Sequence, residues 1–135
     1  MKTIIKFLLA AALAVVTLTG CRDKGRMVEP VFDHAHVLME QRQYNFGTVS
    51  DANPVVEHDF TLINDGGEPL QITEVVNHCR CTHVEYPQEP IKPGHGVTLQ
   101  VYLHVADLDY GEFIRAIDIK TNVGVVNVSL LGVKN

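Results

Sequence analysis

The chain has 135 residues, of which 46% are hydrophobic and 20% charged, an ordinary composition for one globular domain. Its 16 acidic and 11 basic side chains give a formal net charge of −5. Nucleic-acid binders need a clustered basic face to neutralise phosphates, so this balance argues against a nucleic-acid partner. The length also excludes a multi-domain enzyme.

The first 20 residues have the organisation of a secretory signal peptide. Lys2 and Lys6 precede an apolar segment of twelve residues at 7–18, which is too short to span a bilayer, because a spanning helix needs about 20 apolar residues. The sequence Leu-Thr-Gly-Cys that ends at Cys21 resembles the lipobox of bacterial lipoproteins. That resemblance implies that residues 1–20 are removed and that Cys21 is acylated. We therefore expect membrane attachment through a lipid anchor at Cys21, without a transmembrane helix.

The mature chain divides into a tether and a domain. Residues 21–40 show no clear period and predict a lipid anchor followed by a tether, with at most a short edge strand. Residues 41–135 predict one β-domain, because turn signals recur between short segments. These signals are Asn-Pro at 53–54, Asn-Asp-Gly-Gly at 64–67, Pro-Gly-His-Gly at 93–96 and Asn-Val-Gly at 122–124.

The segments between these turns alternate with the period of a strand. The clearest is 97–105, in which every second residue from Val97 to Val105 is apolar and the residues between them are mostly polar. Further strand segments are 44–49, 56–62, 70–76, 113–121 and 125–131. About seven short antiparallel strands with frequent turns predict an all-β, immunoglobulin-like β-sandwich.

Five motifs in order resemble a bacterial envelope family, the domain of unknown function 1573. They are Tyr-Asn-Phe-Gly-Thr-Val at 44–49, Phe-Thr-Leu-Ile-Asn-Asp-Gly at 60–66, Glu-Pro-Leu-Gln-Ile at 68–72, His-Cys-Arg-Cys-Thr at 78–82 and Ile-Lys-Pro-Gly at 91–94. The resemblance extends from about residue 43 to 133 and departs from the family at Arg80 and His78, where Gly and Ser are usual. It implies an immunoglobulin-like fold similar to pilus chaperone domains, and a binding or scaffolding role without enzymatic activity.

Cys79 and Cys81 form the one constellation of the mature chain with clear chemical potential, and three interpretations of it stay open. The first is a pair of structural thiols or a disulfide; extended residues at this spacing have Cα atoms about 6.6 Å apart, near the upper limit for a disulfide. The second is redox chemistry or interchain pairing. The third is a Cu(I) or Zn site with His78 and His83, which requires a bend, because an extended chain separates residues 79 and 83 by about 13 Å.

Three smaller features have simpler interpretations. The histidines of Asp-His-Ala-His at 33–36 are candidate metal ligands, but near a flexible end we expect them to be solvated. The acidic segment 107–112 lacks the ligand spacing of an EF-hand, so a hairpin connection is favoured over calcium binding. His58 lies on an otherwise apolar strand face and is expected to be a hydrogen-bonded, half-buried side chain rather than a base.

No catalytic motif occurs in the sequence: it has no Gly-x-Ser-x-Gly elbow, no His-Glu-x-x-His pair and no glycine-rich phosphate loop. The sequence therefore predicts a non-enzymatic protein without a cofactor, a firm metal site or an evident small-molecule substrate. We expect a protein partner, and a location in the bacterial envelope at the outer membrane, facing the periplasm. The alternative is a metal-handling or thiol-redox accessory lipoprotein that uses Cys79 and Cys81.

Overall fold

The structure of the protein is a computed structural model that describes residues 32–135. The expected signal peptide, the expected lipidation site Cys21 and the first part of the expected tether lie outside these residues, so the signal peptide and the anchor stay predictions. In residues 32–135 no helix is long and apolar enough to cross a membrane.

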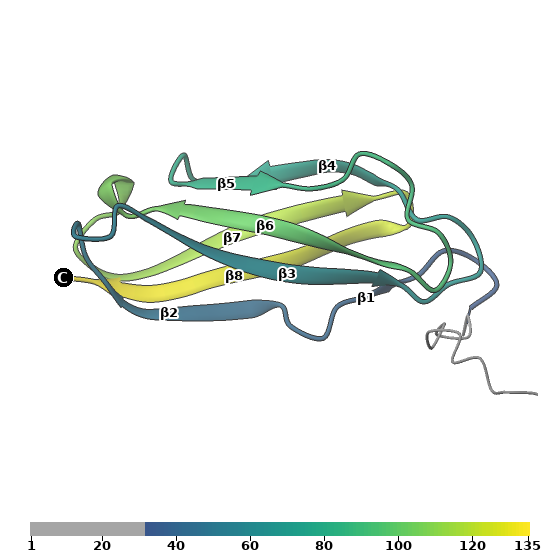
Figure 1. Ribbon diagram of the computed structural model, residues 1–135, viewed down its shortest axis with the longest axis horizontal. Helices are drawn as coiled ribbons and strands as arrows, with labels where there is room; N and C mark the ends of the chain where they lie inside the picture. The colour runs from purple at the N-terminus through teal and green to yellow at the C-terminus, as the bar shows by residue number, and fades with distance from the viewer. Residues whose placement is uncertain (1–31) are drawn as a thin grey trace, which may run out of the picture.

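Eight strands in residues 32–135 form two sheets that pack face to face (Figure 1). The strands are β1 (Val37–Leu38), β2 (Gln43–Val49), β3 (Val55–Asn64), β4 (Ile72–Asn77), β5 (Thr82–Glu85), β6 (Gly96–His104), β7 (Gly111–Thr121) and β8 (Gly124–Lys134). A short 3₁₀ turn, η1 (Val105–Asp107), lies between β6 and β7.

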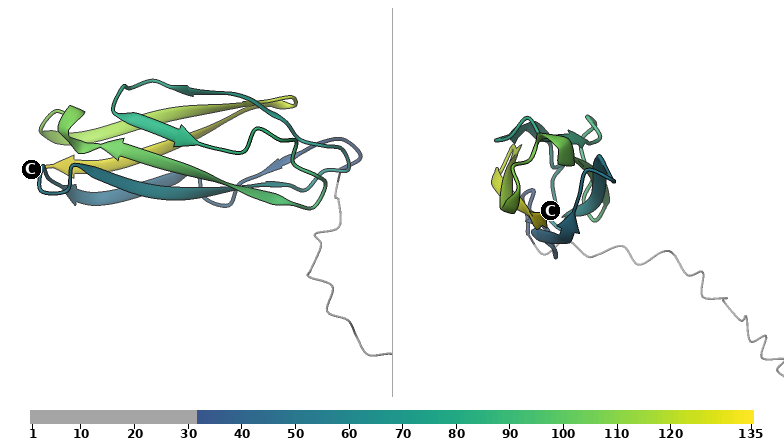
Figure 2. Two further views of the ribbon diagram at one scale, coloured as in Figure 1. Left: turned by 45° about the horizontal axis from the view of Figure 1, so that its top comes forward. Right: turned by 90° about the vertical axis from the view of Figure 1, so that its left-hand side faces the viewer.

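The strand order is β1-β3-β6-β5 in the first sheet and β2-β8-β7-β4 in the second. All neighbouring strands are antiparallel except β2 and β8, which are parallel. Strand β1 belongs to the first sheet and β2 to the second, so the chain crosses from one sheet to the other between these two strands. The end-on view in Figure 2 shows the two layers around a common interior. The predicted immunoglobulin-like sandwich is confirmed, but the strands are not all antiparallel as expected, since β2 pairs with β8 in parallel.

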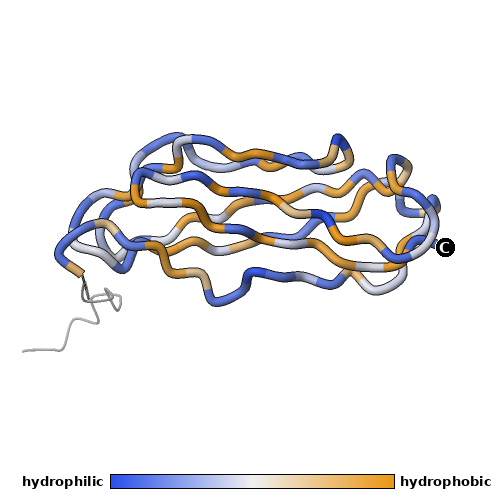
Figure 3. Tube along the Cα trace, turned by 180° about the vertical axis from the view of Figure 1, so that it is seen from behind, coloured by the Kyte–Doolittle hydropathy of each residue, from blue (hydrophilic) through white to orange (hydrophobic). Residues whose placement is uncertain are grey.

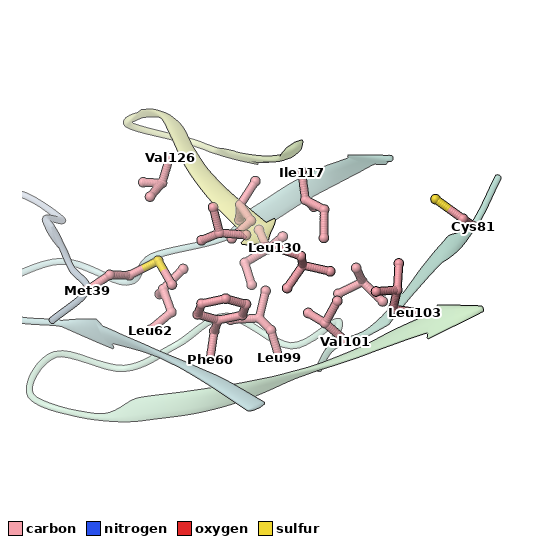
Figure 4. Close-up of a cluster of buried hydrophobic side chains, with 14 of the residues drawn as sticks. Met39, Phe60, Leu62, Cys81, Leu99, Val101, Leu103, Ile117, Val126 and Leu130 are labelled. Carbon is pink, nitrogen blue, oxygen red and sulfur yellow. The ribbon is translucent and has the colours of Figure 1, made fainter. Parts of the chain in front are cut away.

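The alternating segment at 97–105 forms β6 and the start of η1, with its apolar residues in the core. Leu99, Val101 and Leu103 are at most 1% exposed, whereas Gln100 on the opposite face is exposed. Figure 3 shows the same alternation of hydrophobic and hydrophilic residues along the long strands. In Figure 4 these side chains point toward Ile117 and Leu130 of the opposite sheet. Each fully buried side chain of this size contributes about 1.5–3 kcal/mol.

Two boundaries differ from the sequence expectation. The sandwich begins before residue 41: Phe32 forms a bridge with Gly66, and Ala35 and Met39 are buried. The short edge strand allowed within residues 21–40 is β1, at the edge of the first sheet. Residues 32–40 lack a regular period because they bury single side chains instead of one face of a long strand. The acidic segment 107–112 is also not a hairpin connection, since it links β6 of one sheet to β7 of the other. The expected hairpin there is wrong because adjacent strands in sequence lie in different layers.

Asn64 holds the turns together where β3 ends. Its side chain is 0% exposed, and its Nδ2 group donates to the carbonyl oxygens of Glu68 (2.7 Å) and Ile91 (2.9 Å). Its Oδ1 atom accepts a hydrogen bond from the backbone N–H of Gly66 at 3.0 Å. A Cβ atom at Gly66 would lie 2.1 Å from the carbonyl oxygen of His34, so only glycine fits there. The Asn-x-Gly motif therefore has a structural role.

Candidate functional site

Cys79 and Cys81 lie in the turn through which the chain passes from one sheet to the other. β4 ends at Asn77 in the second sheet and β5 begins at Thr82 in the first. The two cysteines form a disulfide, with their Cα atoms 5.1 Å apart. This separation is shorter than that of an extended segment and within the usual disulfide range, because the chain bends here.

Backbone hydrogen bonds fix this bend. The N–H of Thr82 and its Oγ1 hydroxyl both donate to the carbonyl oxygen of Cys79, at 3.3 and 3.1 Å. The N–H of His104 on β6 donates to the carbonyl oxygen of Cys81 at 2.7 Å. Cys81 is 0% exposed, whereas Cys79 is only partly buried against the core. The turn therefore presents one cysteine near the surface and keeps the other inside.

His78 turns away from the cysteines toward the second sheet. Its Nε2 atom lies 2.8 Å from Oδ2 of Asp118 on β7, and Asn127 on β8 donates to the other carboxylate oxygen of Asp118. These hydrogen bonds, first that of His78 and then that of Asn127, hold the pKa of Asp118 below its usual range. Asp118 was not singled out in the sequence, because strand register alone brings it beside His78.

His83 lies on the outer face of the first sheet. It is opposite Tyr102 in register, and its Nε2 atom is 3.7 Å from Oε1 of Glu85. Burial raises the pKa of Tyr102, and the charges of Glu85, Glu57 and Asp59 add to this. His83 is exposed and Cys81 buried, so the shared face expected of an extended chain does not exist.

The four residues singled out in the sequence therefore do not converge on one point. The cysteines are bonded to each other, and the histidines have partners on different sheets. Across residues 32–135 no group of three or more His, Cys, Asp or Glu side chains is arranged to hold a metal ion. A metal site here would require reduction of the disulfide and movement of at least one histidine.

Two of the other histidines, His36 and His58, have defined side-chain partners. His36 Nδ1 lies 2.6 Å from Oδ1 of Asp65, and its ring lies 4.0 Å from that of Phe32. His58 is half-buried, stacks on Tyr44 with ring centroids 3.6 Å apart, and bonds Gln41 at 3.0 Å. Burial lowers the pKa of His58, and the nearby charge of Asp59 opposes this in part. The half-buried, hydrogen-bonded environment expected for His58 is confirmed.

The open edge of β7 was not predicted from the sequence. β8 pairs with all of β7, but β4 pairs with it only from Ile117 to Thr121. In the described part of the chain no strand pairs with residues 111–116 on that side. Arg115 Nη1 donates to the carbonyl oxygen of Ile114 at 3.0 Å, so a side chain occupies an acceptor that a neighbouring strand would otherwise use.

An apolar surface lies beside this edge. Ile114 is 66% exposed and is opposite Leu131 of β8 in register, and Val133 lies two residues further along β8. These three residues line a shallow hollow on the outer face of the second sheet, together with Asn45 and Thr48 of β2 and the carboxylate of Glu112, which is opposite Val133 in register. We refer to Ile114, Leu131 and Val133 as the β7 edge patch. Hydropathy alone cannot predict it, because the same alternation describes buried and exposed strand faces.

Together the strand order of the two sheets and the core between them define an immunoglobulin-like β-sandwich. Residues 37–131 match the family described as Protein of unknown function (DUF1573), and the chain belongs to that family. The resemblance seen in the sequence motifs is thereby confirmed. No curated protein matches the sequence.

Solved structures share the fold at low sequence identity. A protein of unknown function from Porphyromonas gingivalis W83 is 12% identical with a TM-score of 0.66, over 80% of this chain and 49% of the other. The ASH / PapD-like domain 7 of human CEP192 is 10% identical with a TM-score of 0.59, over 73% and 84%. The periplasmic chaperone SfaE is 9% identical with a TM-score of 0.52, over 74% and 58%. The chain thus spans about half the length of the P. gingivalis protein.

Proposed function

We propose that this protein is a lipid-anchored module of the bacterial envelope that binds an extended segment of another protein at the open edge of β7. The observation that carries this proposal is the coincidence of unpaired backbone at residues 111–116 with the β7 edge patch. An added strand gains main-chain hydrogen bonds at such an edge, and alternate side chains select the sequence that binds. The likeness to a periplasmic chaperone and to PapD-like domains supports a binding role.

The proposed occupant has a definite chemistry. It is an extended segment of an envelope protein with apolar side chains on the face that meets Ile114 and Leu131. Its backbone replaces the Arg115 guanidinium as the donor to the carbonyl of Ile114, and this exchange is inexpensive because the Arg115 hydrogen bond is exposed to solvent.

Site-specific crosslinking in the native envelope tests this proposal. A photoreactive amino acid at Ile114 should give one discrete crosslinked product. The matched control is Val125, which is 55% exposed on the outer face of the same sheet and lies beside the β7–β8 turn, and it should not give that product. The product should also disappear when Leu131 is replaced by Asn. Equal products from both positions, or a product that survives Leu131→Asn, would contradict binding at the patch.

The anchor has its own test. Cys21→Ser should release the protein from the membrane fraction, because lipid chains at Cys21 supply the proposed attachment and each buried CH₂ contributes about 0.8 kcal/mol. Fractionation after a high-salt wash measures the effect. Retention of the variant in the membrane would show that something other than the lipid holds the protein. The location at the outer membrane, facing the periplasm, is part of the proposal and is checked by separating the two membranes.

A further inference from the structure

The Cys79–Cys81 disulfide is asymmetric in its exposure. Cys81 is 0% exposed and packs at the end of the core, whereas Cys79 is partly exposed (Figure 4 shows Cys81). A thiolate from solvent therefore approaches the pair at the Cys79 sulfur. The Cys81 sulfur faces the interior and is the leaving group of such an attack.

The disulfide is not what holds the turn in place. A disulfide restricts the unfolded chain in proportion to the logarithm of the loop that it closes, and this one joins residues only two apart. Three hydrogen bonds that do not involve sulfur fix the same turn, two from Thr82 and one from His104. The two cysteines are therefore kept close together in the reduced protein as well.

The local environment also suits a thiolate on Cys79. The backbone N–H of Cys81 donates to Cys79 Sγ at 3.1 Å. This hydrogen bond becomes stronger when the sulfur carries a negative charge. Arg80 lies between the two cysteines, is exposed and adds a positive charge, and such surroundings are typical of reactive cysteines.

We propose that Cys79 and Cys81 are a thiol–disulfide exchange site whose substrate is the thiol pair of another protein. A substrate thiolate attacks Cys79 Sγ, the Cys79–Cys81 bond breaks, and Cys81 leaves as a thiolate that takes a proton. The second substrate thiolate then attacks the substrate sulfur of the mixed disulfide and releases the Cys79 thiolate. The substrate loses two electrons and becomes a disulfide, and the cysteine pair gains them and becomes a dithiol. The same steps in reverse reduce a substrate disulfide.

The exchange site and the β7 edge patch use different residues and different chemistry, so the two proposals fail independently. The crosslinking at Ile114 does not involve sulfur. The exchange reaction can be followed with a small probe that has no peptide backbone. The two experiments therefore distinguish a protein that binds a segment at the edge without exchanging disulfides from one that exchanges disulfides without binding at the edge.

The first experiment compares two single-cysteine chains. In a full-length Cys21→Ser chain Cys79 and Cys81 are the only cysteines, since the sequence has three. Cys81→Ser then leaves Cys79, and the matched control Cys79→Ser leaves Cys81. With glutathione disulfide as the probe, we expect Cys81→Ser to form the mixed disulfide at least about tenfold faster than Cys79→Ser, measured by mass spectrometry. Equal rates, or a faster Cys79→Ser chain, would overturn the proposal.

A second measurement keeps the proposal testable if either variant fails to fold. The Cys21→Ser chain with its disulfide intact is treated with dithiothreitol without denaturant, and the thiols are alkylated with N-ethylmaleimide at successive times. We expect alkylation at Cys79 before Cys81, and reformation of the disulfide when the unalkylated protein is returned to glutathione disulfide. Reduction that requires urea would show a buried structural disulfide and refute the exchange site.

Discussion

Replacing Asn64 tests whether one buried amide holds together the turn that follows β3 and the segment around Ile91. Its side chain makes four hydrogen bonds to the backbone. Three of 2.7–3.0 Å join it to Glu68, Ile91 and Gly66, and in the fourth its Oδ1 atom accepts from the N–H of His36 at 3.4 Å. Asn64→Ala removes all four and leaves the buried N–H of Gly66 without this acceptor, whereas the carbonyl oxygen of Ile91 keeps its hydrogen bond from the N–H of Leu70. Asn122 is the matched control, since it also bonds two backbone groups, at Pro69 and Gln71, but is exposed.

The size of the effect follows from burial. Each intramolecular hydrogen bond contributes about 0.5–1.5 kcal/mol net, and an unsatisfied buried group costs about 1–3 kcal/mol. Asn64→Ala should therefore lower the free energy of unfolding by about 3–5 kcal/mol, a large part of the 5–15 kcal/mol typical of a domain. Asn122→Ala should cost about 1 kcal/mol or less, because water replaces its lost partners.

Urea unfolding followed by far-UV circular dichroism measures both variants, since the chain contains no Trp for fluorescence. Asn64→Asp tests the direction in which the stability changes with pH. A carboxylate would face the carbonyl oxygens of Glu68 and Ile91, so its pKa in the folded state should rise above the unfolded value. That variant should gain stability as the pH falls through the raised pKa, because the protonated acid can donate. If Asn64→Ala costs no more than Asn122→Ala, the reasoning from burial is refuted.

Three other predictions address the core, a close contact and a surface carboxylate. Leu99→Ala should cost about 2–5 kcal/mol in urea unfolding and Gln100→Ala less than about 0.5 kcal/mol; the opposite ranking would reverse the assigned strand faces. Gly132→Ala should cost about 1–3 kcal/mol, because its Cβ would lie 2.6 Å from the Phe113 ring, and an unchanged melting temperature would show that the ring moves aside. The lowered pKa of Asp118 stabilises the folded protein above about pH 4, and this stability is lost as the pH falls through the pKa of the folded state. The urea midpoints of wild type and Asp118→Asn should therefore differ at pH 7 and converge near pH 2. A difference that stays constant with pH would contradict this.

Much of the fold could be predicted from the sequence because strands with one buried face carry a period of two. β6, β7 and β8 follow this rule, and turn residues separate them. The same rule fails at residues 32–40, where single side chains such as Met39 are buried without a period. It also misassigned the link from β6 to β7, because alternation does not say which sheet a strand joins.

The candidate site was predicted only in part. The sequence singled out Cys79 and Cys81 from their spacing, but it could not decide between an extended segment and a turn. The turn depends on partners far along the chain, above all the N–H of His104 that bonds the carbonyl of Cys81. The open edge of β7 could not be predicted from the sequence either, because it depends on where β4 ends: β4 leaves six residues of β7, 111–116, without a partner on that side.

The amino-acid sequence by itself determined the class of fold, the apolar face of each long strand and the turns, since these depend on local periods and on residues with special backbone freedom. The tertiary structure alone decided which polar groups are inside. Lys134 is next to the last residue, yet it is 4% exposed, and its Nζ group donates to the carbonyl oxygen of Leu108 at 3.1 Å and lies 2.9 Å from Oδ1 of Asp51. A charge can be buried only where partners from distant segments meet it, and no pattern within one strand reports those partners.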